Sequence, residues 1–262
     1  MRHLPVAAMV GLIGVWLCSL LAGYDVVSDV SPGRAGLGPS AAHWLGCDHL
    51  GRDVWWRMVT ATEAFVGYGA LACISCLLVG GSLGGLSGWL GGASSQVLRY
   101  LFSVIASLPR LVLVLLICAI YGDDPVILAL AASLAYVPTL GEAIAGRIEE
   151  LRGAEFVEAA QAHGMSDAAV LLRELLWGNC RVLIGRHLLY LFSAFLVLES
   201  TLSYIGGFGI EEPQPSWGNM LSFEFGIQDG NALAWLAPAL AIWLTVLSAT
   251  LTAGQLNEAS HG

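Results

Sequence analysis

Two charged side chains, Arg110 and Glu199, lie near the middle of long apolar segments of this sequence. An unpaired charge inside a lipid bilayer costs on the order of 2.5–3.5 kcal/mol, so each should face a partner or a water-filled path. We expect both residues to line a translocation pathway, either as an ion pair or separately. A purely structural salt bridge between them is the alternative.

A serine nucleophile is a second candidate for chemistry. The run Gly85-Leu86-Ser87-Gly88 has the spacing found around the reactive serine of intramembrane proteases. Such a serine needs a base within hydrogen-bond reach, and none of the six histidines lies within an apolar segment, although His187 adjoins one. Ser87 also stands in a run of glycines that helix packing explains. An intramembrane serine protease is therefore the less favoured alternative.

Metal chemistry has two candidate groups. One polar loop holds side chains that could bind nickel: His43, Cys47, Asp48 and His49. Cys73 and Cys76 form a Cys-x-x-Cys pair, but in an apolar stretch without a second ligand pair. We expect solvated loop residues in the first case, close helix packing in the second, and no metal site.

Composition places the chain in a membrane. Of its 262 residues 56% are hydrophobic and 12% are charged, about half the usual charge of a soluble domain, and the mean hydropathy is +0.73. All 11 basic residues are arginine, which excludes a Walker A lysine and a lysine Schiff base. We therefore expect no cofactor on this chain, with any ATP and Mg²⁺ bound by partner subunits. The net charge of −9 argues against nucleic acid as a partner.

Six segments are long enough to cross a bilayer as helices. We predict an all-α membrane protein with spans near residues 5–24, 64–86, 99–121, 125–144, 188–209 and 233–253. The first resembles a signal peptide but lacks a clear cleavage site, so we interpret it as a retained anchor. Glycines at 80, 81, 84, 85 and 88 favour close packing of the second span.

Arginine positions predict the orientation. Five arginines lie between the fourth and fifth spans: Arg147, Arg152, Arg173, Arg181 and Arg186. This loop should be cytoplasmic, with both termini on the same side, although the outer loop also carries three arginines. The predicted organisation is an anchor (1–24), an extracytoplasmic loop (25–62), a transmembrane domain (63–253) containing the cytoplasmic loop 145–187, and a cytoplasmic tail (254–262).

Residues 155–177 are the longest polar-patterned segment of the chain. Alanine and glutamate predict a helix from about Ala154 to His163. Gly164 can end it in the left-handed conformation, Ser166 can cap a second helix, and Asp167 suits the first turn of that helix. A helix-turn-helix between membrane spans needs a surface to dock against.

Three motifs carry a family resemblance. Glu158-Ala159-Ala160 followed by Gly164 resembles the EAA loop of ATP-binding-cassette (ABC) importer permeases, although Trp177 stands where that family has proline. Residues 45–57, 198–206 and 213–221 resemble segments of the C-type subunit of dipeptide, oligopeptide and nickel permeases. The motif positions that we single out are Gly46, Asp48, Gly51, Arg52, Asp53, Pro215, Ser216, Trp217, Gly218 and Asn219. Six positions before Pro109, where that family usually has an acidic residue, this sequence has Ser103.

The resemblance implies a type I importer fold and a permease subunit of an ATP-driven importer of peptides, or of a related solute such as nickel, in the bacterial cytoplasmic membrane. It implies a homologous permease, two ATP-binding cassette subunits, an extracytoplasmic solute-binding protein and surrounding lipid as partners. Coupling to the ATPase would fall to Glu158, Ala159, Ala160, Gly164, Ser166 and Asp167. An ion-driven secondary transporter, which needs no coupling loop, is the other alternative.

Overall fold

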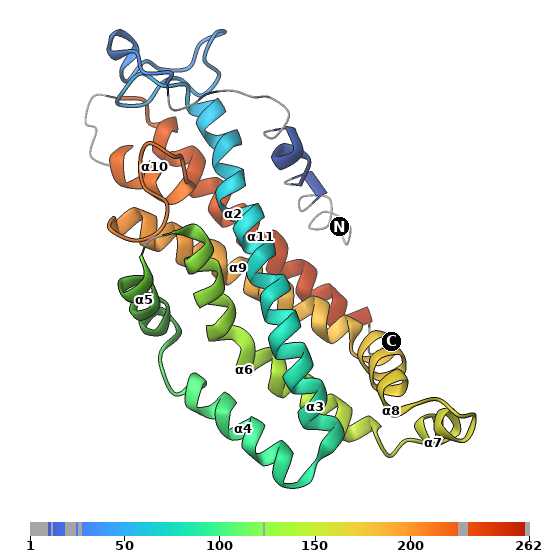
Figure 1. The fold of residues 1–262 in the computed structure, drawn as a ribbon. Helices are drawn as coiled ribbons and strands as arrows, with labels where there is room; N and C mark the ends of the chain where they lie inside the picture. Colours follow the sequence, from blue (N-terminus) through green and yellow to red (C-terminus); the bar gives the residue numbers. More distant parts are fainter. Residues whose placement is uncertain are drawn as a thin grey trace.

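The computed structural model describes residues 10–11, 13–18, 25, 28–122, 124–224 and 230–259. Within these ranges the chain is helical and contains no strand, and its only extended pairing is an isolated bridge between Cys47 and Asp53. The prediction of an all-α protein is thus confirmed. The loops 28–53 and 206–216 gather at one end of a helical bundle, here called the loop end, and the short helix α7 (Glu155–Ala162) lies at the opposite end (Figure 1).

The second predicted span is part of one helical run, Val54–Leu90. It consists of α2 (Val54–Cys76), a π-helical turn η2 (Leu77–Gly81) and α3 (Ser82–Leu90). Asp53 caps the run, because its carboxylate accepts hydrogen bonds from the N–H groups of Trp55 at 2.9 Å and Trp56 at 3.3 Å. The helix begins at this cap rather than near residue 64, where the apolar stretch begins, so residues 54–62 are helical and not loop.

The third predicted span is broken. It consists of α4 (Gly92–Ala106) and α5 (Arg110–Tyr121), whose axes differ by 82°. Pro109 explains the break, because proline has no N–H for the helical ladder and disfavours helical geometry in the residue before it. The segment 99–121, predicted as one span, therefore contains parts of two helices with a sharp bend between them.

The centre of the bundle is α6 (Pro125–Leu151), which packs against the α2–α3 run, α4, α5 and α9 (Arg181–Ile205). Glycines of the α2–α3 run lie directly on its backbone. A Cβ atom added to Gly84 would collide with Gly141, and one added to Gly88 would collide with the backbone of Ala145. The close packing predicted from the glycine spacing is confirmed.

The remaining elements follow α7 in order. They are α8 (Asp167–Ala169), the π-helical η3 (Val170–Asn179), α9, α10 (Trp217–Glu224) and α11 (Leu233–Ala259). Helix α9 leads from the α7 end to the loop end, and α11 packs along α9 (Figure 1).

Four helical segments of the described chain are long and apolar enough to span a membrane, and the broken α4–α5 pair is a fifth candidate. The predicted anchor, residues 5–24, lies largely outside the described residues, so the count of six spans stays a prediction. Residues 254–259, assigned to a tail, continue α11.

Candidate functional site

The turn after α7 has the geometry that the sequence predicts. Gly164 adopts φ +84°. Its N–H donates to the carbonyl of Gln161 at 2.9 Å, and the N–H of Met165 donates to the carbonyl of Ala160 at 3.1 Å. These two bonds make a Schellman motif, which closes the end of the helix.

The second helix of this segment begins as expected. Ser166 caps it, with its hydroxyl accepting from the N–H of Ala169 at 3.3 Å, and Asp167 is its first residue. The helix then continues as the π-helical η3, a change of helix type that residue propensities alone did not indicate. The predicted helix-turn-helix is therefore confirmed.

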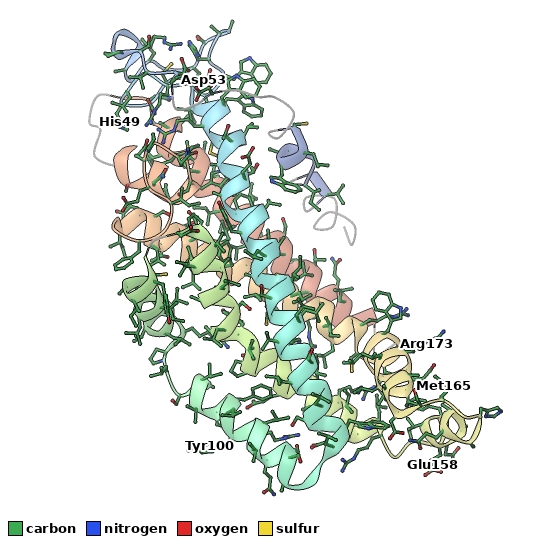
Figure 2. The ribbon with its side chains drawn as sticks, viewed as in Figure 1. His49, Asp53, Tyr100, Glu158, Met165 and Arg173 are labelled. Atoms are coloured by element: carbon green, nitrogen blue, oxygen red, sulfur yellow. The ribbon has the colours of Figure 1, made fainter. Side chains whose placement is uncertain are left out.

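Most of the predicted coupling residues are exposed at the tip of the molecule. The exposed ones are Glu158, Ala159, Gly164, Ser166 and Asp167, and Figure 2 shows Glu158 and Met165 at this tip. Ala160 is different, since it is half-buried and packs with Val157, Val170 and Leu175 in an apolar cluster. Its small side chain lets α7 lie on η3.

Trp177 projects from η3 with 75% of its surface exposed. Proline at this position would lack the N–H that a helix requires, and the π-helix continues to Asn179. Trp177 borders an open apolar groove of about 700 Å³ between η2–α3 and the start of α9.

A buried ionic cluster joins distant parts of the chain at the loop end. Arg52 donates from Nε to Asp48 at 2.6 Å and from Nη1 to Glu212 at 2.5 Å. Arg57 donates to the same two carboxylates. The arginine side chains are 2% and 0% exposed. Two positive and two negative charges balance, as burial of ions requires.

This cluster changes the acidity of its members. Burial, the largest single influence, acts to raise the pKa of Asp48 and Glu212, but the hydrogen bonds and charges of Arg52 and Arg57 outweigh it. Both carboxyl pKa values therefore lie below their ordinary range. Glu212 and Arg57 were not singled out as site residues from the sequence, and the acidic pair before Pro213 was the available signal.

Asp53 has partners other than its neighbour Arg52. It caps α2 and accepts from Nδ1 of His43 at 2.7 Å. Gly46 and Gly51 both adopt φ +76°, and a Cβ atom on either would collide with neighbouring atoms. These two glycines therefore fix the tight folding of the loop that carries Asp48 and Arg52.

The motif at residues 213–221 includes the start of α10, which packs against α2 and α9. Trp217 packs on Phe65 of α2, with ring centroids 4.3 Å apart, and its Nε1–H donates to the carbonyl of Met58 at 3.1 Å. Gly218 lies against the backbone of Ser200, where a side chain would collide.

Side-chain and backbone hydrogen bonds close the turn around this motif. Asn219 donates to the carbonyls of Ile210 and Gln214. It also accepts from the N–H of Ser216, whose neighbour Pro215 is buried. These motif residues therefore stabilise the fold through contacts within the chain.

Arg110 and Glu199 do not pair. Arg110 donates from Nη2 to Thr139 at 2.9 Å, and its guanidinium lies over the ring of Tyr136 at 4.1 Å. Glu199 is 1% exposed and accepts from the hydroxyl of Ser203 at 2.8 Å. The ion-pair alternative is therefore wrong, since each charge contacts a different polar side chain, and the expectation that the two residues line a pathway stays a prediction.

Ser87 does not have the surroundings of a nucleophile. Its buried hydroxyl shares a hydrogen bond of 3.0 Å with Ser95, and neither residue is a base. The candidate metal ligands do not form a metal site among the described residues. Burial raises the pKa of the Cys47 thiol, and the described residues contain no group of three His, Cys, Asp or Glu side chains that could hold a metal ion.

Known proteins match the chain over nearly its whole length. The family described as "Binding-protein-dependent transport system inner membrane component" matches residues 80–259. This chain belongs to that family. It is thus a membrane-embedded permease subunit of an ABC importer and not an enzyme, since ATP hydrolysis lies in separate subunits. The family works with an ATPase and a solute-binding protein.

Individual relatives agree with this assignment. The permease is 27% identical to the "Glutathione transport system permease protein GsiD" of Pectobacterium atrosepticum over 98% of this chain and 86% of the relative. It is 28% identical to the "Dipeptide transport system permease protein DppC" of Alkalihalophilus pseudofirmus over 96% of this chain and 84% of the relative. The resemblance inferred from the motifs is confirmed.

Proposed function

We propose that this permease translocates short peptides inward and takes its energy from an ATPase that docks on α7 and the turn after it. The observation that carries the coupling role is the exposed Schellman turn at Gly164, which follows the exposed Glu158 and Ala159 of α7. The names of two relatives, a glutathione and a dipeptide permease, support peptides as the solute class.

The packing of α7 supports a route for coupling. Val157 of α7 is 1% exposed and belongs to the same apolar cluster as Val170 and Leu175 of η3 and Leu191 of α9. Movement of an ATPase groove that holds α7 would therefore move η3 and the start of α9. A bound ligand shifts such a two-state equilibrium only through different affinities for the two states.

The proposed orientation puts the α7 end in the cytoplasm. The loop end also carries Arg34, Arg52 and Arg57, but the two other connections on that side, residues 122–124 and 206–216, carry no arginine. Helix α11 would then end in the cytoplasm, and the solute-binding protein would meet the loop end. The proposed assembly contains this chain, a homologous permease, two ATP-binding cassette subunits and the binding protein.

The test is purification of the tagged chain with its partners in mild detergent, followed by reconstitution into liposomes. We expect an ATPase with a Walker A motif and a second permease to co-purify, and a radiolabelled dipeptide to accumulate only with ATP and the solute-binding protein. Uptake of ⁶³Ni²⁺ serves as the competing solute. A stable chain that purifies alone would overturn the assembly, and ATP-driven nickel uptake without peptide uptake would overturn the solute class.

A further inference from the structure

A cavity of about 260 Å³ with polar and apolar lining residues opens among four of the helices that form the membrane bundle. Its lining comes from α2, α5, α6 and α9: Cys76, Arg110, Tyr136, Thr139, Leu140, His187, Leu188, Tyr190 and Leu191. Tyr136 and Thr139 lie near the middle of α6, and His187 lies in the first half of α9. The cavity therefore lies within the bundle, toward the α7 end.

Arg110 is the permanent charge of this cavity. After the break at Pro109, Arg110 is the first residue of α5, and its side chain contacts Tyr136 and Thr139 of α6. A guanidinium has five N–H donors, and among the described residues Thr139 is the one hydrogen-bond acceptor that Arg110 contacts. Arg110 makes no ion pair with an acid of the described chain, and it is exposed, so its remaining donors can meet a ligand.

The other polar groups of the cavity favour an anion. The lining contains hydroxyl groups and one histidine but no aspartate or glutamate. Nδ1 of His187 lies 2.8 Å from the carbonyl of Leu183. Because a carbonyl oxygen can only accept a hydrogen bond, Nδ1 carries the proton in this contact. Nε2 is the ring nitrogen that this hydrogen bond does not use. A cavity with one fixed positive charge and no negative charge attracts anions and repels cations.

We propose that this cavity binds a carboxylate of the translocated solute, with Arg110 as the residue that selects for the negative charge. A guanidinium matches a carboxylate through paired N–H donors. The ring of Tyr136 and the hydroxyl of Thr139 hold Arg110 in place. The proposal rests on the proposed peptide function, because a peptide carries a carboxylate through the membrane.

The experiment measures charge selectivity in the reconstituted complex. A Tyr190→Cys substitution places a thiol in the cavity wall at a side chain that is 42% exposed. Labelling rates are compared for two water-soluble methanethiosulfonates of similar size, one with a sulfonate and one with a trimethylammonium group. Mass spectrometry of the segment that contains residue 190 separates this thiol from Cys76 and the other native cysteines, and the parent chain gives the background.

With Arg110 present, the sulfonate reagent should react faster than the ammonium reagent by about tenfold or more. Arg110→Gln should remove this preference and Arg110→Lys should keep it. Alanyl-alanine should protect the thiol, and its C-terminal amide should protect it much less. Melting temperatures of the variant complexes control for folding.

Two results would overturn the proposal. Equal ratios in the parent and in Arg110→Gln would show that Arg110 does not select charge. A thiol that no water-soluble reagent reaches would show that lipid or a partner helix fills the cavity. The peptide function is judged separately by dipeptide uptake. Uptake without charge selectivity contradicts only the carboxylate site, and selectivity without uptake contradicts only the peptide function.

Discussion

Arg52 reaches Glu212 across the loop end, with its Nη1 2.5 Å from Oε2 of the glutamate. The bond joins the residue before the cap of α2 to the loop between α9 and α10, and Arg57 supports it from the first turn of α2. The family motif around Gly51 is thus stabilised by Glu212, which lies far away in the sequence.

Glu212→Gln should destabilise the permease. The substitution leaves Arg52 and Arg57 with one carboxylate between them, and breaking a buried ion pair typically costs about 3–5 kcal/mol. We expect the lower end of this range, because the Glu212 side chain is 21% exposed. The melting temperature of the detergent-solubilised complex measures the effect. Glu211→Gln is the matched control, since Glu211 is exposed and, among the described residues, its carboxylate accepts from the N–H of Gly207 alone.

Acid should weaken the same cluster. The folded pKa values of Asp48 and Glu212 lie below the ordinary values of 3.8 and 4.5. Their contribution to stability is complete above those values, declines as the pH falls through them, and is lost below the lowered pKa values. Melting temperature should therefore fall between about pH 5 and pH 3, with a shallower decline in Glu212→Gln. An equal decline in both proteins would assign the acid sensitivity to other carboxylates.

We predict that Glu199 stabilises the fold and does not line the translocation pathway. Its carboxylate accepts from Ser203, whose hydroxyl in turn accepts from the N–H of Ile210. Glu199→Leu removes the acceptor and should cost roughly 1–3 kcal/mol, whereas Glu199→Gln keeps an acceptor oxygen. Uptake per folded complex should be unchanged in Glu199→Gln. Lost uptake in a stable Glu199→Gln complex would return Glu199 to the pathway.

Gly164→Val should uncouple ATP hydrolysis from transport. Valine is rarely found at φ +84°, so the Schellman turn would be distorted while no neighbouring atom is displaced. Gly153→Val is the control, because Gly153 also has open space around it but lacks a positive φ. The ratio of ATP hydrolysed to dipeptide transported checks the prediction. Equal ratios in the two variants would remove the turn from the coupling route.

Features with local causes could be predicted from the sequence. Gly164 and Ser166 specify the turn after α7 through their own neighbours, and the glycine spacing in residues 80–88 indicates a surface that packs closely. The beginning of α2 at Val54 was missed because Arg57 and Glu63 interrupt the apolar pattern there, whereas the Asp53 cap sets where the helix begins.

Features that join distant residues could not be predicted. Nothing in the sequence pairs Arg52 with Glu212, or Arg110 with Thr139 and Tyr136, because those contacts depend on how the helices pack. Hydropathy likewise treats residues 99–121 as continuous, whereas the backbone restriction of Pro109 divides them.

The most direct test of the central claim is cross-linking from α7 to the ATPase. Ala159→Cys places a thiol on the exposed face of α7, and Trp44→Cys places one on a side chain that is 65% exposed at the loop end. With a bifunctional maleimide, and with the parent chain as background, Ala159→Cys should link to the ATPase subunit and Trp44→Cys should not. An ATPase that co-purifies but links only to Trp44→Cys, or to neither variant, would contradict docking on α7.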